Sequence, residues 1–307
     1  MPALKVQKSI HINAPREQVY NLVRDFHSWP KWSPWLIAEP KCTLTFPEDG
    51  KSYSWDGQII GSGNIAITKE NSLSSIDYDL RFLKPWKSQA DVRFLFTEKD
   101  GGTEVSWVMD SSLPWFMFWM TTMMTGLLGM DYERGLKMLK DLVETDTVPS
   151  QLDFPGQHGF CAQHYIGIKT TCSIDETEKH MDSDFEKLKT WLRESNAQPS
   201  GKPFSIYHTW NFKDRTTDYT IAFPFEDSPP SVPAGFLSGD LPACQVYPVV
   251  HVGPYRHLGN AWSAGIMHSR AKVFRQNKGI PPFEIYDNNP EEVAPEELIT
   301  TVHFPVK

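Results

Sequence analysis

The chain has 307 residues, of which 40% are apolar and 22% are charged. This composition is typical of folded globular domains, and the length suits two domains of about 150 residues each. The formal net charge of −8 argues against a nucleic-acid partner, because affinity for nucleic acids comes mainly from Lys and Arg on phosphates. The same negative charge is compatible with cationic ligands.

The first half of the chain begins with a strand pattern at 4–12 and a helical pattern at 13–26. About six runs of alternating apolar and polar residues follow, separated by turn signals such as "PEDG" and "KDGG". A helical stripe at 131–144 closes this half. A sheet of that many strands must curl and bury one face. We therefore predict an α+β helix-grip domain over 1–148, a curled antiparallel sheet around a long C-terminal helix with a hydrophobic cavity.

The stretch at 111–130 contains no charged residue, and a run of that length could span a bilayer. Pro114, Gly126 and Gly129 interrupt it, and it lies between a strand pattern and a helix of the same domain. We therefore expect it to line a cavity or to dip into a membrane surface rather than to cross a membrane.

The second half of the chain repeats itself. The strand "PFSIY" at 203–207 returns as "PFEIY" at 282–286, and each copy reads strand, helix, strand, strand. One copy alone has too small a core, but two copies related by a pseudo-twofold axis form one antiparallel sheet with both helices on one face. We predict such a duplicated β-α-β-β domain over 158–307. A ligand is expected on the other face of its sheet, or in the groove where the copies meet.

Residues 149–157, "PSQLDFPGQ", read as a linker between the two domains. Four scattered cysteines without a CxxC pair predict reduced thiols in a cytoplasmic protein. His158, Cys161 and His164 have HxxCxxH spacing, but on a strand the cysteine would point away from both histidines. No metal site and no cofactor are therefore predicted.

The repeat makes Ser205 an internal control for Glu284, because both stand in the middle of equivalent strands. A carboxylate between Phe283 and Ile285 is poorly solvated, and a buried unpaired carboxylate is costly or becomes protonated. Glu284 faces either a pocket, as a cation anchor or a general base of raised pKa, or a solvent-exposed surface where a Lys or Arg pairs with it. The pattern alone leaves both possibilities open.

Large aromatic residues gather at the predicted junction of the two copies. Tyr286, and Tyr207 through the repeat, share the parity of Glu284 along their strands. Flat rings around a carboxylate suit a hydrophobic cation or a planar molecule, although each ring alone also suits an ordinary core. The candidate ligand-binding residues are Glu284, Tyr286, Tyr255, Trp262, Tyr207 and Trp210.

Residues 160–307 resemble the GyrI-like small-molecule-binding domain, the effector-binding domain of bacterial transcription activators, through "VVHVGPYRHLGNAW", "DYTIAFPF" and "PPFEIYDNNPEEVAPEELITTVHFPV". The resemblance implies a bacterial-type protein whose buried glutamate and rings receive drug-like, often cationic ligands. Glu284 and Tyr286 match that role, and Tyr255 and Trp262 match it more loosely. Some relatives are hydrolases of reactive small molecules, which implies Glu284, Tyr255 and Tyr286 as catalytic residues if this chain is an enzyme. The helix-turn-helix of the activators is missing, so a DNA-binding regulator is not supported.

Residues 3–147 resemble the START-like superfamily, which includes polyketide cyclase-like proteins, through "SIHINAPREQVYNLVRDFHSWPKWSPW" and "GMDYERGLKMLKDLVE". The resemblance implies a helix-grip fold around a hydrophobic cavity and says nothing about substrate. The candidates for lining this second cavity are Trp55, Tyr78, Trp107, Trp115 and Trp119.

Taken together, these patterns predict a non-catalytic protein with two tandem modules that senses or sequesters small hydrophobic molecules, cationic ones included. Two alternatives remain open. One is a hydrolase that uses Glu284 as general base, and the other is an adaptor at the membrane surface that uses 111–130. The sequence specifies neither the ligand nor the oligomeric state.

Overall fold

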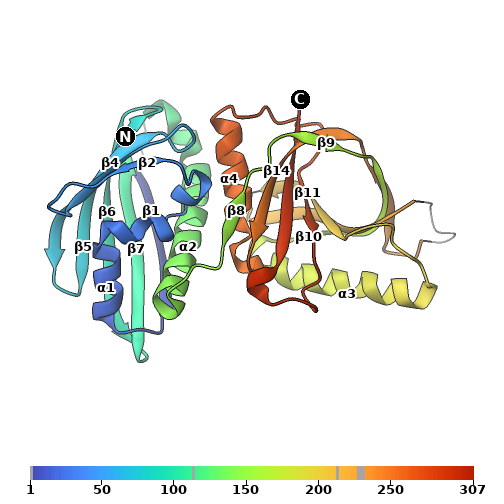
Figure 1. Ribbon diagram of the computed structural model, residues 1–307, viewed down its shortest axis with the longest axis horizontal. Helices are drawn as coiled ribbons and strands as arrows, with labels where there is room; N and C mark the ends of the chain where they lie inside the picture. The colour runs from blue at the N-terminus through green and yellow to red at the C-terminus, as the bar shows by residue number, and fades with distance from the viewer. Residues whose placement is uncertain (1–2, 113–114, 212–213, 227–231) are drawn as a thin grey trace. The chain divides into compact units, whose positions relative to one another are not determined.

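The computed structural model describes residues 3–112, 115–211, 214–226 and 232–307. The chain forms two compact units, the first centred on Met1–Gln151 and the second comprising Leu152–Gly265 and Lys272–Lys307 (Figure 1).

The first unit is a seven-stranded antiparallel sheet with the order β1-β7-β6-β5-β4-β3-β2. A short helix follows β1, and a long helix follows β7 after a 3-10 turn, η3. This arrangement confirms the predicted helix-grip fold. The elements are β1 (Ala3–Ile12), α1 (Arg16–Arg24), β2 (Thr43–Thr45), β3 (Ser52–Asp56), β4 (Ser62–Asn71), β5 (Ser75–Lys84), β6 (Ser88–Lys99), β7 (Gly102–Ser112), η3 (Trp115–Met120) and α2 (Thr121–Thr145).

Aromatic rings fill the space between the sheet and α2. Trp107 of β7 stacks on Tyr132 of α2 with ring centroids 4.0 Å apart, and on Phe94 of β6 at 4.9 Å. Trp55 and Tyr78, two further candidates for lining the expected cavity, are buried in the same core cluster. These three candidates therefore face the interior, where they pack ring against ring as core.

Trp115 and Trp119, the other two candidates, lie on the outside of the unit. Both belong to η3 and are 75% and 68% exposed. The expectation that they line an internal cavity is wrong in this structure, because η3 presents both rings to solvent.

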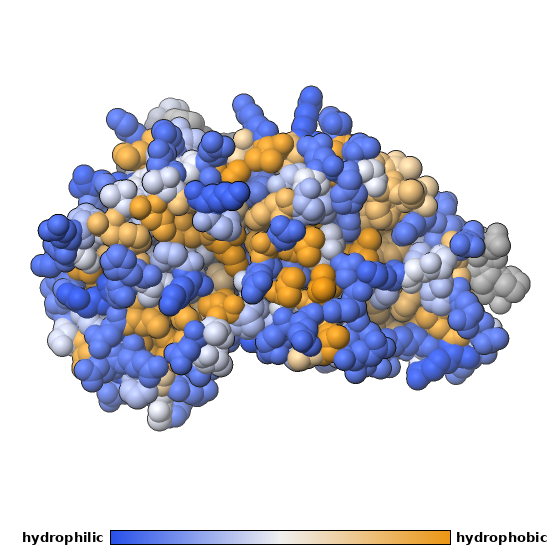
Figure 2. All heavy atoms as spheres, in the orientation of Figure 1, coloured by the Kyte–Doolittle hydropathy of each residue, from blue (hydrophilic) through white to orange (hydrophobic). Residues whose placement is uncertain are grey.

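In the uncharged stretch at 111–130, the described residues belong to the end of β7, η3 and the first turns of α2, while 113–114 lie outside the described residues. Among the described residues, no helix is long and apolar enough to cross a membrane. On the face seen in Figure 2, hydrophilic and hydrophobic side chains are interspersed over both units.

The described residues of the second unit form a nine-stranded, largely antiparallel sheet with the order β13-β10-β12-β11-β15-β16-β14-β8, and β9 pairs with β14. Figure 1 shows this sheet curling round, with α3 running beside it. The elements are β8 (Gln151–Asp153), β9 (His158–Phe160), β10 (Gln163–Ser173), α3 (Thr177–Ser195), β11 (Phe204–Asn211), β12 (Thr216–Phe225), β13 (Leu237–Leu241), β14 (Cys244–Val252), η5 (Tyr255–His257), α4 (Gly259–Arg270), β15 (Phe283–Tyr286) and β16 (Ile299–Val306).

The predicted duplication is confirmed. The first copy is β10-α3-β11-β12, the second is β14-α4-β15-β16, and they meet where β11 pairs with β15. Ser205 is the direct cross-strand partner of Glu284 in that pairing. The pseudo-twofold axis therefore passes between these two residues.

Two short strands were not anticipated. Residues expected to be a pure linker include β8, which joins the sheet beside β14, and β13 extends the opposite edge beside β10. The sheet face away from Glu284 is also closed, because Phe204, Ile206 and Phe283 are buried against β9 and β13 residues there. That face of the sheet is therefore covered by side chains and does not offer the ligand site expected there.

The tight contact between α2 and Trp107 gives a direct test of the first unit. A Cβ at Gly135 would lie 2.8 Å from Trp107 Cζ3 and 3.1 Å from Pro34 Cδ, whereas a Cβ at Gly129 would meet only the flexible end of Lys8. Gly135→Ala should destabilise the protein by about 1–3 kcal/mol in spite of the better helix propensity of alanine.

The matched variant Gly129→Ala should be neutral or stabilise by up to about 1 kcal/mol. Urea unfolding of both variants measures the difference. Equal effects of the two substitutions would contradict this packing of α2.

Candidate ligand-binding site

Glu284 lies in the interior of the second unit. Its side chain is 1% exposed, so the alternative of a solvent-facing glutamate is excluded. The alternation of β15 places Glu284 and Tyr286 on one face of the sheet and Phe283 on the other, as the sequence predicted.

Three side chains donate hydrogen bonds to this carboxylate. The hydroxyls of Tyr207 and Tyr286 lie 2.8 and 2.7 Å from Oε1, and the indole Nε1 of Trp262 lies 2.8 Å from Oε2. The donors come from β11, β15 and α4, so both copies of the duplicated unit contribute. In the described part of the chain no Lys, Arg or His forms an ion pair with Glu284.

Burial raises the pKa of Glu284 above its usual 4.5, and the three hydrogen bonds oppose that shift only in part. Burial, followed by the nearby charge of Glu284, also holds the pKa of Tyr207 and Tyr286 well above 10. Both phenols therefore remain protonated donors. A carboxylate accepts about four hydrogen bonds, so these donors occupy most of its capacity.

Ser205, the counterpart of Glu284 in the first copy, supports the cluster from across the pseudo-twofold axis. Its Oγ lies 2.9 Å from the hydroxyl of Tyr286. Because that phenol donates its proton to Glu284, the serine donates to the phenol in turn. The two copies thus supply equivalent tyrosines, Tyr207 and Tyr286, but only one acid.

Partly exposed rings surround this buried group. Tyr255 of η5 is 37% exposed and meets Tyr286 edge to face, with ring centroids 5.8 Å apart. Burial raises the pKa of Tyr255 to about 12, with smaller contributions from Glu284 and Asp182. The ring of Trp210 stacks on Tyr207 at 5.3 Å.

Trp210 reaches this face because of an irregularity that the sequence did not reveal. The pairing of β11 with β12 shifts register between Tyr207 and Thr209. Such a bulge inserts one extra residue and re-aims the side chains that follow it. Without the shift, simple alternation would place Trp210 opposite Tyr207.

The structure thus brings all six candidate residues together. Tyr286, Tyr207 and Trp262 each donate a hydrogen bond to Glu284, while Tyr255 and Trp210 join through ring contacts. Sequence reasoning missed Met181 and Phe185 of α3, which lie against Tyr207 and Tyr286. Their helical spacing had indicated only an ordinary buried stripe.

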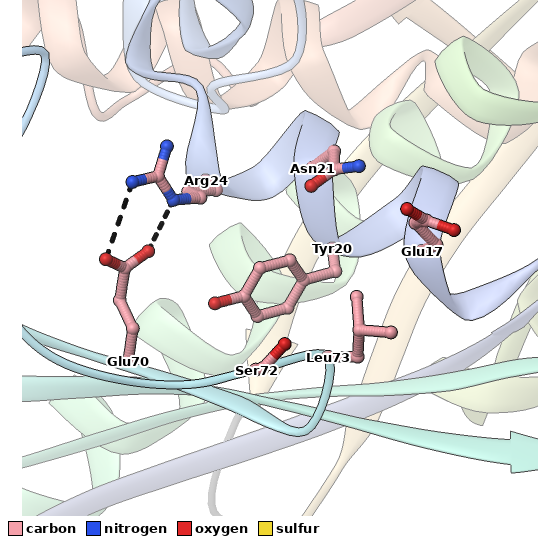
Figure 3. Close-up of a pocket in the computed structure, with 7 residues that line it drawn as sticks. All are labelled: Glu17, Tyr20, Asn21, Arg24, Glu70, Ser72 and Leu73. Atoms are coloured by element: carbon pink, nitrogen blue, oxygen red, sulfur yellow. Dashed lines mark hydrogen bonds and ion pairs between the residues drawn. The ribbon is translucent and has the colours of Figure 1, made fainter.

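A different hollow, of about 500 Å³, lies in the first unit and was not anticipated (Figure 3). It is formed by α1 and the turn between β4 and β5, and an ion pair between Arg24 and Glu70 crosses it. Arg24 and Glu70 neutralise each other there. Its lining residues are Glu17, Tyr20, Asn21, Arg24, Glu70, Ser72 and Leu73.

No cluster of three His, Cys, Asp or Glu side chains that could hold a metal ion occurs within the described residues. Of the residues with HxxCxxH spacing, His158 lies in β9 and His164 in β10, where His164 Nδ1 is 2.9 Å from Asp240.

Comparison with known families decides what kind of domains these are. Residues 160–307 match the model of the GyrI-like small molecule binding domain, and residues 3–144 match that of the polyketide cyclase, dehydrase and lipid transport family. The chain joins a polyketide cyclase-like domain to a GyrI-like domain. Both resemblances that the sequence motifs carried are thereby confirmed.

Solved structures similar to this chain include EcmrR in a complex with DNA, at 16% identity and a TM-score of 0.41, covering 60% of this chain and 66% of that one. SAV2435 bound to tetraphenylphosphonium is similar at 15% identity and a TM-score of 0.39, covering 50% and 94%. Protein MLL2253 from Mesorhizobium loti is similar at 14% identity and a TM-score of 0.36, covering 46% and 96%. A comparison with curated protein sequences gave no match.

The buried acid of the GyrI-like domain should make the free energy of unfolding depend on pH. Because folding raises the pKa of Glu284, the folded state binds the proton more tightly than the unfolded state, and stability must fall as pH rises from about 4.5 through the raised pKa. Glu284→Gln removes this dependence. The stability of the wild type relative to this variant should therefore be greatest near pH 4 and decline toward neutral pH.

Urea unfolding of both proteins between about pH 4 and pH 9 measures the difference. Glu296→Gln, at an exposed position of the same domain, is the matched control and should follow the pH dependence of the wild type, because it keeps Glu284. A difference between wild type and Glu284→Gln that grows with pH would contradict a raised pKa.

Proposed function

We propose that the GyrI-like domain binds small hydrophobic cations through Glu284, and that the protein senses or sequesters them without changing them chemically. The observation that carries the proposal is a buried carboxylate whose hydrogen bonds all come from neutral donors. It lies in a domain of a small-molecule-binding family.

The other buried acid of the same domain makes the contrast clear. Asp184 of α3 is also buried, but Lys187 Nζ lies 2.8 Å from its Oδ1, and Thr170 and Tyr219 donate to its Oδ2. Asp184 therefore carries its own counter-charge. Glu284 has the hydrogen bonds without the cation, and a ligand of positive charge would supply what is missing.

The surrounding rings suit such a ligand. A cation is attracted to the faces of Trp and Tyr, and the attraction grows when water is excluded. Tyr207, Tyr286 and Trp262 fix the carboxylate, while the partly exposed Tyr255 and Trp210 offer faces and edges to an incoming hydrophobic group.

The hydrolase alternative requires Glu284 to reach and deprotonate a water molecule. Its raised pKa suits a general base, but both of its oxygens already accept hydrogen bonds from side chains that bury it. The binding function therefore needs fewer changes of this site than hydrolysis does.

A direct test uses tetraphenylphosphonium, with the uncharged triphenylphosphine oxide as the matched neutral ligand, in isothermal titration calorimetry. Glu284→Gln should lower the affinity for the cation by at least about tenfold, equivalent to about 1.4 kcal/mol of binding free energy. The affinity for the neutral ligand should stay within about twofold of the wild-type value. The wild-type affinity for the cation should rise with pH through the pKa of Glu284, since only the ionised form attracts it.

Glu296→Gln again serves as the control and should bind as the wild type does. Unchanged cation affinity in Glu284→Gln would contradict the proposal. Conversion of a reactive substrate by the wild type and not by Glu284→Gln would favour the hydrolase.

A second candidate function, contact with a membrane surface, is favoured by one observation. Trp115, Phe118 and Trp119 project large apolar side chains into solvent from η3, and Phe118 is 66% exposed. Trp86, in the turn between β5 and β6, is exposed at the same end of the sheet, since β6 begins opposite the end of β7. Exposed Trp and Phe are typical of segments that enter the lipid interface.

Liposome flotation tests this second candidate. The wild type should float with lipid vesicles, and Phe118→Glu should reduce the bound fraction several-fold, because a charge in the interface opposes insertion. Leu83→Glu, at an exposed position before the β5–β6 turn, should have a smaller effect. Absence of flotation by the wild type would end the membrane hypothesis without affecting the cation site.

A cytoplasmic location remains part of the proposal. All four cysteines lie in the described ranges and are free thiols, as in a reducing compartment.

A further inference from the structure

The side chains around Glu284 differ in how firmly they are held. Trp262 of α4 is fixed by the hydrogen bond of its indole to Oε2. The corresponding contribution of α3 is Met181, whose sulfur lies 3.5 Å from the hydroxyl of Tyr207. That hydroxyl already donates to Glu284 at 2.8 Å, and a thioether is a weak acceptor. Met181 is therefore held mainly by packing.

Met181 is also one of the partly exposed residues of the cluster, whereas Glu284, Tyr207 and Tyr286 are buried. It covers the phenol of the first copy in the way that Phe185, one helical turn further along α3, covers the phenol of the second copy. The ring of Phe185 meets Tyr286 edge to face at 5.3 Å. Together these two residues separate the carboxylate cluster from solvent on the α3 side.

The neighbouring charge marks the same place as an approach for cations. Asp182, the exposed residue next to Met181, makes the smallest of three contributions that raise the pKa of Tyr255, after burial and Glu284. Asp182, Met181 and the partly exposed Tyr255 therefore share one side of the cluster. On this side an exposed acid, Asp182, stands next to Met181 in the chain, and Glu284 lies buried behind the phenol that Met181 contacts.

We propose that Met181 is the movable cap of the Glu284 site and sets the size of the ligand it admits. This inference rests on the proposed binding function. Methionine is unbranched and adapts to irregular space by rotating its side chain, so it can yield without a change in the fold of α3. A ligand must displace the Met181 side chain, and the free energy needed to open the site reduces the net free energy of binding.

Variants at this position separate size from charge. Met181→Ala should bind tetraphenylphosphonium about tenfold more tightly and with a faster association rate, because less of the protein is in the closed form. The affinity for tetraethylammonium, which is smaller, should change by less than about threefold. Met181→Phe, with a larger and stiffer side chain, should lower the affinity for tetraphenylphosphonium by about tenfold.

Leu192→Ala is the matched control, because Leu192 lies on the same helix but packs in a different core cluster, around Trp191 and Phe225. It should leave both affinities within about twofold of the wild type. A gain in affinity in Leu192→Ala equal to that in Met181→Ala would overturn the cap, since it would show that loosening α3 anywhere opens the site.

Stopped-flow fluorescence and calorimetry of the full chain measure these effects, with the thermal midpoint of each variant showing that it is folded. Wild-type affinity in Met181→Ala, with binding still lost in Glu284→Gln, would refute the cap and leave the proposed function intact. Absence of tetraphenylphosphonium binding in the wild type and in every variant would refute the proposed function and the cap with it.

Discussion

The carboxylate of Glu284, buried at the seam of a duplicated sheet, is the group on which the second half of the molecule depends. Its three donors come from β11, β15 and α4, so the two copies and one helix must be correctly placed for the charge to be tolerated. An unsatisfied buried carboxylate would cost several kcal/mol. The network therefore couples the residue that bears the function to the assembly of the fold itself.

The same position explains why the two copies of the strand differ in one residue. Ser205 and Glu284 are direct cross-strand partners at the pseudo-twofold axis, where side chains on one face lie about 5 Å apart. Two glutamates there would place like charges together in a buried site, and one of them would have to be protonated. A serine relieves that repulsion and adds a donor to Tyr286. The symmetry of the duplication is broken where symmetry would be most costly.

Both units are rich in aromatic rings, but they use them differently. In the polyketide cyclase-like domain, Trp107 stacks on both Tyr132 and Phe94 within the hydrophobic core cluster, and the result is a packed core. In the GyrI-like domain, Tyr207, Tyr286 and Trp262 converge on one acid. Aromatic content alone therefore does not identify a binding site. The distinguishing feature is a polar atom toward which the rings point.

The duplication, the helix-grip fold and the candidate acid could all be predicted from the amino-acid sequence. Repeat spacing, alternation and a single Ser-to-Glu change are local properties that survive in any packing. It also placed Tyr286 and Tyr207 beside Glu284, because the parity of a strand follows from its pleat.

The contact of Trp210 with the cluster depends on the folded structure, since a bulge in β11 reverses the parity on which sequence reasoning relies. The folded structure likewise decided that Met181 and Phe185 cover the acid and that Trp115 and Trp119 face outward. These outcomes depend on how helices and turns meet the sheet. Residues of the same hydrophobicity can therefore lie in the core, over the candidate site or on the surface. Contacts between distant segments of the chain, and not the local sequence pattern, determine which of these locations each residue takes.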